Sequence, residues 1–584
     1  MYILKYSVGI LTITINYQLS TFNWKRGGFL NVIIGNAWPY ANGELHLGRI
    51  AVLLPGDVLA RYHRMMGDDV VFVSGSDSHG TPVTMKAKAE GITPEEASLY
   101  YHEKIKECFE RLGFSFDIFT KTHTEYHSNK VGLFIKELYD KGYIYEKEVE
   151  QTYCPKCKEY LLDRYIEGIC PSCGSYAVGD QCDECSEIFE AEDLLEKKCI
   201  FCKSEPIIKE TKHLFFALSK LETDVKRIYI RQIGWRENAQ KITNRYLNEG
   251  LRDRAVTRDI DWGVDVPFEG FEDKKIYVWI EAVMGYLTAS MKCIDERGEN
   301  YMDYWNGDDS RIYFVHGKDN IPFHTVILPA ILAGLGIKKP NIREISSEYL
   351  KLEGKNFSAV KNWAIWPDYI LEKYDVDLIR YYLISNGPEV RDTDFSWKLF
   401  INTNNNELVG QFGNLINRVL AFINKNFDGK IPKGTIDKKF KDKMFKLYCD
   451  VGDNIEEGNF KKALEYVFSI IKDTNKYFDK EMPWINIKKD RAKCAQTMYV
   501  CVQIIANISN LLEPFMPFSA EKIRGFLGIN EPVWMPIEIK EGKINNLQIL
   551  FERIDKGIIE EEVKNLKLTK KLSSIISGEK LDII

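Results

Sequence analysis

The stretch from residue 29 to residue 91 constrains the fold most, because apolar strands and amphipathic helices alternate along it. We expect strands at 29–35 and 70–76, and helices at 47–67 and 82–91. This β-α-β-α order is typical of a parallel sheet whose strands are joined by helical crossovers. The sequence therefore predicts an α/β fold with a ligand crevice at the carboxyl ends of the strands.

Three polar residues of this stretch lie where a ligand would bind. His46 directly precedes the first helix, where free backbone N–H groups and the helix dipole favour an anion such as phosphate. Taken alone, a histidine at this position is more often structural than a ligand. Asp77 and His79 come just after the second strand and should face the same crevice. No G-x-G-x-x-G sequence follows either strand, which argues against a dinucleotide enzyme.

A cysteine-rich insertion covers residues 143–211. Eight of the 13 cysteines form four C-x-x-C pairs there, the spacing of metal ligands rather than of disulfides, which also indicates a reducing cytoplasm. Eight thiolates suit two structural Zn²⁺ ions, because a complete thiolate set leaves no open position for catalysis. We favour nested pairing, with the two inner pairs on one ion and the two outer pairs on the other. Sequential pairing is the alternative. The pairs are Cys154/Cys157, Cys170/Cys173, Cys182/Cys185 and Cys199/Cys202.

The α/β alternation should resume after the insertion, with strands at 275–279 and 311–317. From residue 367 onward apolar residues recur at helical spacing, which predicts an all-helical domain. Side chains expected to line the same crevice as Asp77 are Trp279, Tyr286, Asp319 and His324.

The N-terminal segment and the net charge narrow the class of protein. Residues 1–29 are apolar only in patches, so they predict neither a membrane span nor a signal peptide. A further hypothesis places the translation start near Leu30. The net charge of −6 argues against a globally basic nucleic-acid coat, while a local basic groove remains compatible with RNA.

Several segments resemble the methionyl-tRNA synthetase family of the class I aminoacyl-tRNA synthetases. They are AWPYANG with HLG, GSDSHGTP, YVWIEA, GKDNIPFH and NKYFDKEMPW, in the family's order. The resemblance implies an ATP-dependent, AMP-forming methionine–tRNA ligase. Its Rossmann-like catalytic domain would be split by a zinc-knuckle insertion and followed by an α-helical anticodon-binding bundle. The implied substrates and partners are L-methionine, ATP with Mg²⁺, and tRNA(Met), for a cytoplasmic monomer that does not bind membranes.

The resemblance also implies roles for individual residues. The methionine site would comprise Ala37, Trp38, Tyr40, Asp77, Trp279, Ala282, Tyr286, Phe323 and His324. ATP would contact His46, Gly48 and Asp319, and the catalytic set would be His46, Gly48, Arg49, Lys355 and Ser358. Asn414, Arg418 and Trp484 match the positions that recognise the CAU anticodon. From the pattern alone, Trp484 is more often a core or capping residue and Arg418 part of a solvated face.

The same resemblance divides the chain into seven segments. They are an N-terminal extension (1–29), the first half of the catalytic domain (30–142), the zinc-binding insertion (143–211), the second half of the catalytic domain (212–340), a stem-contact region with the signature loop (341–400), the anticodon-binding domain (401–565) and a tail (566–584).

The ATP side departs from the family pattern at two places. Arg49 replaces the second histidine of the usual His-x-Gly-His, and the signature loop, residues 356–360, lacks both of its usual lysines. Loss of one preorganised cation typically costs about 2.7–4 kcal/mol, or roughly a hundred- to thousand-fold in rate. Lys355 and Lys361 flank the loop and either substitute for the lost lysines or are ordinary surface residues.

The methionine pocket departs from the family pattern as well. Val283 stands where proline is usual, and Leu328 stands where tryptophan is common, so we expect a reshaped cavity. Together with the altered loop, these differences leave an alternative function. In that alternative the chain is a divergent synthetase paralogue with weak, altered or absent aminoacylation that still binds tRNA or a methionine-like ligand.

Overall fold

The computed structural model describes residues 28–161, 165–179, 182, 193–232, 234–359 and 361–577, with side chains to residue 568. The hypotheses on residues 1–27 therefore lie outside the described residues. No helix in the described ranges is both long enough and apolar enough to cross a membrane.

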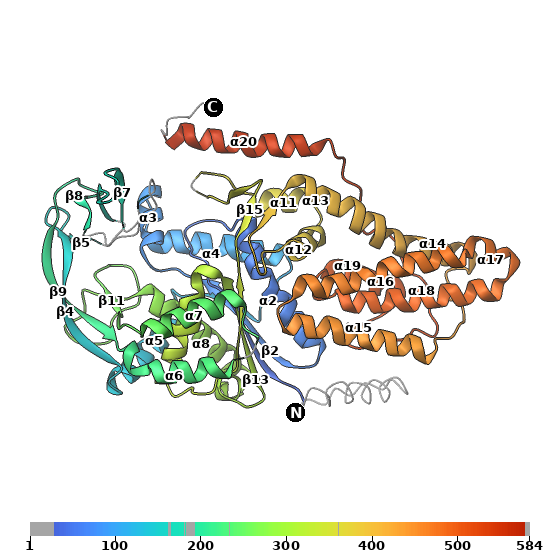
Figure 1. The fold of residues 1–584 in the computed structure, drawn as a ribbon, viewed down its shortest axis with the longest axis horizontal. Coiled ribbons are helices and arrows are strands. Elements are labelled where there is room, and N and C mark those ends of the chain that lie inside the picture. The colour runs from blue at the N-terminus through green and yellow to red at the C-terminus, as the bar shows by residue number, and fades with distance from the viewer. Residues whose placement is uncertain are drawn as a thin grey trace.

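A five-stranded parallel sheet forms the centre of the catalytic domain (Figure 1). Its strand order is β14-β13-β1-β2-β3, so the chain leaves β1 towards β2 on one side and returns through β13 on the other. The direction of strand addition reverses at β1, and ligands bind at such switch points. The strands are β1 (Asn31–Asn36), β2 (Asp69–Ser76), β3 (Ile118–Lys121), β13 (Ser310–Gly317) and β14 (Ile342–Ser347).

Successive side chains of β1 point to opposite faces of the sheet, and both faces are covered. Val32 and Ile34 belong to the core that includes α2 (Leu47–Met65). Ile33 belongs to the core that includes α8 (Val278–Glu296). Burial on both faces explains the near-continuous apolar sequence of the strand and confirms the predicted α/β fold.

The prediction of a strand at 275–279 is wrong. Only β12 (Lys275–Ile276) is extended, paired antiparallel with β11 (Thr257–Arg258), and α8 begins at Val278. A short apolar run does not distinguish a strand from a buried helix, and here the apolar pattern continues for several helical turns. Trp279 therefore lies in the first turn of α8. The short strand β3 was not predicted, because the sequence indicated only a connecting segment between two helices there.

The cysteine-rich insertion extends from the catalytic domain on a two-stranded antiparallel arm (Figure 1). The arm consists of β4 (Ile144–Cys154) and β9 (Ile207–Phe216), and it carries the cysteine pairs at its far end. The smaller strands are β5 (Glu159–Tyr160), β6 (Ile166–Ile169), β7 (Tyr176–Val178), β8 (Leu195–Cys199) and β10 (Arg254–Ala255).

Helices cover the catalytic sheet and form the rest of the chain (Figure 1). Around the sheet lie α3 (Thr81–Glu90), α4 (Pro94–Arg111), α5 (Glu125–Asp140), α6 (Leu218–Arg231), α7 (Glu237–Glu249), α9 (Tyr301–Trp305), η3 (Lys318–Asn320), η4 (Phe323–Ile327) and α10 (Leu328–Gly334). The connecting region contains β15 (Leu350–Leu352), β16 (Lys355–Asn356), α11 (Pro367–Lys373), α12 (Val376–Ser385), β17 (Thr393–Phe395), α13 (Trp397–Thr403) and η5 (Asn404–Gly413). The bundle comprises α14 (Asn414–Asn426), α15 (Lys438–Glu456), α16 (Phe460–Glu481), α17 (Pro483–Lys489), α18 (Arg491–Leu512) and α19 (Pro517–Leu527).

Two expected domain boundaries fall inside structural units. The boundary at 340/341 precedes β14, which pairs with β13 in the central sheet. The boundary at 565/566 falls inside α20 (Ile558–Ser577), which lies across the connecting region and contacts α13 rather than continuing the bundle (Figure 1). The tail helix therefore returns to the part of the chain that carries the signature loop.

Candidate active site

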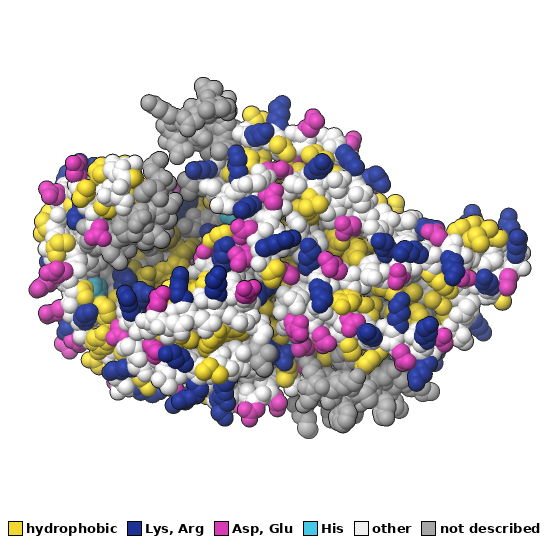
Figure 2. Space-filling view, viewed as in Figure 1, with side chains coloured by type: hydrophobic (Ala, Val, Ile, Leu, Met, Phe, Trp, Pro, Cys, Tyr) yellow, Lys and Arg dark blue, Asp and Glu magenta, His cyan; other side chains and the backbone are white. Residues whose placement is uncertain are grey.

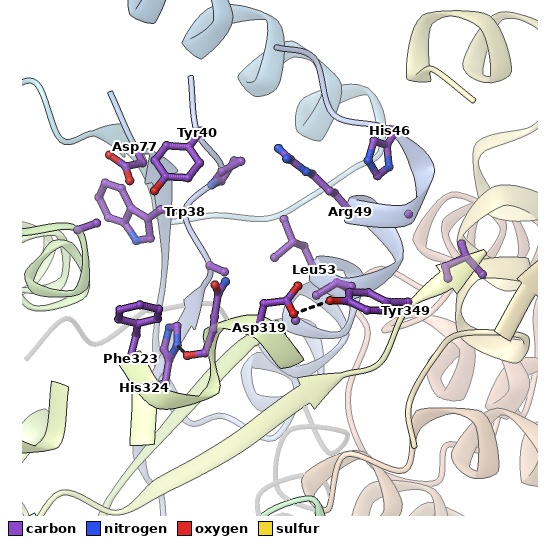
Figure 3. A pocket seen from close by; sticks show the side chains of 18 of the residues that line it. Trp38, Tyr40, His46, Arg49, Leu53, Asp77, Asp319, Phe323, His324 and Tyr349 are labelled. Atoms are coloured by element: carbon purple, nitrogen blue, oxygen red, sulfur yellow. Dashed lines mark hydrogen bonds between the residues drawn. The ribbon is translucent and has the colours of Figure 1, made fainter. Parts of the chain in front are cut away.

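A cavity of about 550 Å³ lies at the carboxyl ends of β1, β2 and β13, where the strand order reverses. The turn after β1 and the start of α2 form one wall, and α8, η4 and the residues after β13 form the other (Figure 3). The cavity brings together all the residues that the resemblance assigned to methionine and ATP, and also Arg49 of the predicted catalytic set. They are Ala37, Trp38, Tyr40, His46, Gly48, Arg49, Asp77, Trp279, Ala282, Tyr286, Asp319, Phe323 and His324.

One end of the cavity is an aromatic pocket. The Trp279 and Phe323 rings stack with centroids 4.3 Å apart, and the edge of Tyr40 meets Trp279 at 5.9 Å. Val283, at the position where the family usually has proline, also lines the cavity. Leu328 is fully buried and lies outside the lining. The pocket therefore suits a flexible apolar side chain.

An uncharged pair closes the aromatic pocket. Nδ1–H of His324 donates to the carbonyl of Asn320 at 2.8 Å, so Nε2 accepts from the Tyr286 hydroxyl at 2.9 Å. Burial lowers the pKa of His324 to about 3, so the imidazole is neutral at pH 7. A neutral polar group at the end of an apolar pocket accommodates a weakly polar atom such as a thioether sulfur.

A second buried pair supports His324 from behind. His316 stacks on His324 with centroids 4.0 Å apart, and its Nδ1–H donates to the carbonyl of Gly317. Nε2 of His316 therefore accepts a hydrogen bond, and the Glu344 carboxyl group lies 2.6 Å from it. Burial raises the pKa of Glu344 to about 8, which agrees with a protonated acid donating to a neutral imidazole.

Asp77 places a buried carboxyl group at the cavity wall. The residue is 3% exposed, and its carboxyl group accepts a hydrogen bond from the backbone N–H of His79 at 3.3 Å. Burial raises the pKa of Asp77 well above its ordinary value, and the charge of Glu281 adds to the shift. A cationic ligand group would remove this penalty, so Asp77 is suited to bind an ammonium.

Glu281 lies near enough to Asp77 for its charge to act on it, and it is held in its ionised form. Burial opposes its ionisation, but His79 and His127 together lower the pKa of Glu281 to about 2. Nδ1 of His79 lies 2.7 Å from the Glu281 carboxylate, and Nε2 of His127 lies 3.3 Å from it. His79 was expected at this crevice, whereas His127 was not part of the predicted site.

His46 occupies the residue before α2, as the sequence predicted. Burial lowers its pKa to about 3, and its Nδ1 is buried without a hydrogen-bond partner among the described residues. The Phe357 ring of the signature loop stacks on its face at 4.9 Å. A Cβ at Gly48 would lie 3.0 Å from that same phenylalanine, so glycine permits the close approach of loop and helix.

Asp319 lies on the opposite side of the cavity and accepts a hydrogen bond from the Tyr349 hydroxyl at 2.5 Å (Figure 3). The Lys318 ammonium lies 4.0 Å from the centroid of the Tyr349 ring and pairs with Glu348 at 2.6 Å. Sequence reasoning missed Tyr349, although it lies just beyond the carboxyl end of β14, where ligand-binding residues of parallel sheets occur.

Ser358 of the signature loop and the two lysines that flank the loop lie away from the cavity. The Lys355 ammonium is 5.2 Å from the centroid of the Trp363 ring, and Ser358 pairs through its backbone with Trp363. Asn356 and Phe357 line the cavity, whereas Lys355, Ser358 and Lys361 do not.

The cysteine pairs converge in the nested arrangement that we favoured. The four Sγ atoms of the outer pairs, Cys154, Cys157, Cys199 and Cys202, all lie within 4.8 Å of one another. The inner cluster contains Cys170, Cys173 and Cys182. Cys185 lies outside the described residues. Four converging thiols with no other ligand type fit a tetrahedral structural zinc ion.

The three residues matched to anticodon recognition lie in the helical bundle, and Arg418 and Trp484 both contact the Phe478 ring. Asn414 and Arg418 are one helical turn apart on α14, and Trp484 on α17 is 46% exposed. Arg418 pairs with Asp479 at 2.5 Å and lies 4.6 Å from the centroid of the Phe478 ring, which neighbours Trp484. The end of the bundle that carries α17 shows hydrophobic and basic side chains side by side (Figure 2).

Comparisons with known proteins agree with this geometry. Residues 32–420 match the family described as tRNA synthetases class I (M), and residues 431–550 match the anticodon binding domain of methionyl tRNA ligase.

Individual relatives match over almost the whole chain. The methionine–tRNA ligase of Bacillus cereus (strain B4264) is 50% identical over 92% of this chain and 99% of its own length. Methionine–tRNA ligase 1 of Alkaliphilus oremlandii (strain OhILAs) is 49% identical over 92% of this chain and 100% of its own length. A solved structure of Mycobacterium tuberculosis methionyl-tRNA synthetase in complex with methionyl-adenylate has the same fold. Its TM-score is 0.75 at 24% identity, over 89% of this chain and 99% of that chain.

Proposed function

This chain belongs to the methionyl-tRNA synthetase family of class I, and we propose that it joins L-methionine to tRNA(Met) through a methionyl-adenylate. The observation that carries the proposal is the placement of the buried Asp77 carboxyl group beside the aromatic pocket that ends in Tyr286 and His324. The same cavity also contains the start of α2, where a phosphate chain would bind.

Methionine would lie with its ammonium on Asp77 and its side chain among the aromatic rings. Ala37, Trp38, Tyr40, Trp279, Ala282 and Phe323 would surround the side chain, and the sulfur would point towards Tyr286 and His324. Each sulfur–aromatic contact contributes about 0.3–1.5 kcal/mol. The position of Asp77 would leave the methionine carboxylate directed towards the ATP half of the cavity.

ATP would lie between the start of α2 and Asp319. His46 and Gly48 would approach its phosphates, and Asp319 its ribose. The methionine carboxylate attacks the α-phosphorus, pyrophosphate leaves, and the enzyme contributes position and electrostatics rather than a covalent nucleophile. Mg²⁺ bound with ATP would neutralise part of the phosphate charge. Lys355 and Ser358 lie outside the cavity wall, so any contribution from them requires the loop to move inwards.

The bundle tip would recognise the CAU anticodon. Asn414, Arg418 and Trp484 combine an amide, a guanidinium and an exposed indole, the groups that hydrogen-bond and stack with unpaired bases. Stacking on one aromatic residue contributes about 1–3 kcal/mol per base.

Two structural zinc ions would hold the insertion together. One would bind the outer cysteine pairs and the other the inner pairs, with Cys185 as the fourth ligand of the inner site. Bound zinc supplies folding free energy beyond what the small buried apolar cluster of the module provides. We further propose that the protein acts in the cytoplasm as a monomer.

Methionine-dependent ATP–pyrophosphate exchange tests this function. We expect exchange with methionine that exceeds the rates with leucine, isoleucine, valine and cysteine. An exchange rate equal to the blank without enzyme would overturn the proposal and support the divergent paralogue. Asp77→Asn should raise the KM for methionine, because an amide cannot neutralise the ammonium, while the KM for ATP should change much less.

A further inference from the structure

The cavity contains a single permanently positive side chain among the described residues that line it. That side chain is Arg49, and the acidic residues of the lining are Asp77, Asp319 and Glu348. A triphosphate entering the cavity would meet no other permanently charged cation in the described part of its wall. Lys318, just beyond the wall, is already engaged by Glu348 at 2.6 Å and by Asp392 at 3.2 Å. The positive charge required for the triphosphate is therefore not supplied by the neighbouring lysine.

Within the described part of the chain, the Arg49 side chain forms no hydrogen bond or ion pair, and its electrostatic neighbours are Tyr40 and His46. Arg61, on the same helix, provides the contrast. It pairs with Asp57 at 2.9 Å and Glu513 at 3.1 Å, and it donates to the carbonyl of Gly113 at 2.7 Å. Arg61 is thus a structural residue that joins elements of the fold. Arg49 extends instead from α2 between Tyr40 and His46 into the cavity (Figure 3).

The signature loop does not supply this charge. The positions where the family resemblance places lysines are Asn356 and Ala359, and both are uncharged. Asn356 lines the cavity, whereas the neighbouring Lys355 lies against Trp363. A cation has therefore been lost from the loop, and a permanent cation stands in the helix at the place of a titratable histidine.

We propose that Arg49 is the phosphate-binding cation of adenylate formation in this chain, in place of the lysines of the signature loop. In this step the methionine carboxylate oxygen forms a bond to the α-phosphorus. The bond from that phosphorus to the bridging oxygen breaks, and pyrophosphate leaves with the electron pair. Arg49 keeps its proton and donates N–H hydrogen bonds to the phosphate oxygens as their charge grows. A planar guanidinium can bind two phosphate oxygens at once.

This inference rests on the proposed function, and kinetics of the purified full chain test it. Arg49→Ala should slow adenylate formation about 100- to 1,000-fold, the usual effect of removing one preorganised donor, with little change in the KM for methionine. Arg49→Lys keeps the positive charge but cannot bind two phosphate oxygens as a planar guanidinium does. Its rate should therefore fall less than that of Arg49→Ala. Arg227→Ala, an exposed arginine paired with Asp224 on α6, is the matched control and should keep the native rate.

A pH profile separates charge from shape within one variant. The rate of Arg49→His should rise as pH falls below the ordinary imidazole range, because burial lowers the pKa of an imidazole in this wall, as it does for His46, and the cation forms only on protonation; the native rate should show no such step. Exchange by Arg49→Ala within about threefold of the native rate, or a parallel pH profile for Arg49→His, would overturn the inference alone. Absence of exchange in the native protein would overturn the proposed function and this inference with it.

Discussion

The Phe357 ring stacks almost face to face on the His46 imidazole, with centroids 4.9 Å apart and planes 11° apart. This contact joins the signature loop to the start of α2, although 310 positions of sequence lie between the two residues. The loop is thus held against the helix end by an aromatic contact rather than by lysines. Four consequences of the described packing and one of the cysteine arrangement can be tested directly.

Loss of the aromatic contact should weaken loop closure over ATP. Phe357→Ala should slow adenylate formation about 2- to 12-fold, corresponding to the 0.5–1.5 kcal/mol of an aromatic pair. Single-turnover adenylation with saturating methionine measures this effect. Phe357→Tyr keeps the ring and should stay near the native rate. An equal rise in the KM for methionine would show that the substitution disturbs the whole cavity instead.

The exposed indole at the bundle tip should matter for tRNA and far less for adenylation. Trp484→Ala should reduce kcat/KM for tRNA about 5- to 150-fold, because one stacked base contributes about 1–3 kcal/mol. Aminoacylation and ATP–pyrophosphate exchange measured on the same preparation separate the two steps. Trp484→Phe should recover part of the loss. Equal losses in both reactions would contradict a role in anticodon recognition.

The contribution of Glu344 to the stability of the protein should decrease as pH rises. Its native pKa of about 8 lies above its ordinary value of 4.5, so between these values the native state binds a proton that the unfolded chain does not. Its contribution to the free energy of unfolding therefore declines from about pH 4.5 to about pH 8, by at most about 1.4 kcal/mol per pH unit.

Glu344→Gln tests this sign, because glutamine resembles the protonated acid and can donate to His316. The variant should match the native protein near pH 5 and exceed its stability increasingly towards pH 8, as measured by urea unfolding at each pH. The charged groups near this pair are Arg236, which faces His316, and His324, which faces Glu344 and carries a charge only at acidic pH. A stability difference that does not change with pH would show that Glu344 is already ionised at neutral pH.

Much of the fold could be predicted because its signals are local. Strand β1 is apolar on both faces, and His46 precedes α2 as expected, so the switch point of the sheet follows from one short stretch. The apolar run before Trp279 was ambiguous, since its helical continuation is decided by packing on β2 and β3. Tyr349 and the buried pair of His79 and Glu281 depend on contacts between distant segments, which no local pattern encodes.

The cysteine arrangement makes a prediction that separates nested from sequential pairing. The native chain should bind two zinc ions, and the double variant Cys154→Ser/Cys199→Ser should lose one, because both residues belong to the outer cluster. The double variant Cys154→Ser/Cys170→Ser should lose both. Sequential pairing predicts the reverse pattern of losses. Metal content by mass spectrometry, with the melting temperature of the catalytic domain as a control for folding, distinguishes the two arrangements.

The returning helix α20 is anchored by one buried carboxylate. Glu562 is 1% exposed and accepts from the hydroxyls of Tyr369 at 2.5 Å and Tyr374 at 2.8 Å, and from the Lys373 ammonium at 2.9 Å. All three donors lie in or directly after α11, which follows the signature loop. Hydrogen bonds to a charged group contribute about 1.5–3 kcal/mol each, and the half-exposed lysine contributes at the lower end because water screens it.

Removal of this anchor should release α20 before the rest of the protein unfolds. Glu562→Gln should increase proteolytic cleavage in the segment before α20 several-fold, with a smaller change in the midpoint of global unfolding, because only the helix detaches. Glu561→Gln is the matched control, since Glu561 is its exposed neighbour on the same helix. Cleavage of Glu562→Gln at the native rate would show that the apolar contacts of α20 hold it without the carboxylate. Because α11 continues from Trp366, which donates a hydrogen bond to Asn362 of the loop region at 3.0 Å, release of α20 should also slow adenylation modestly.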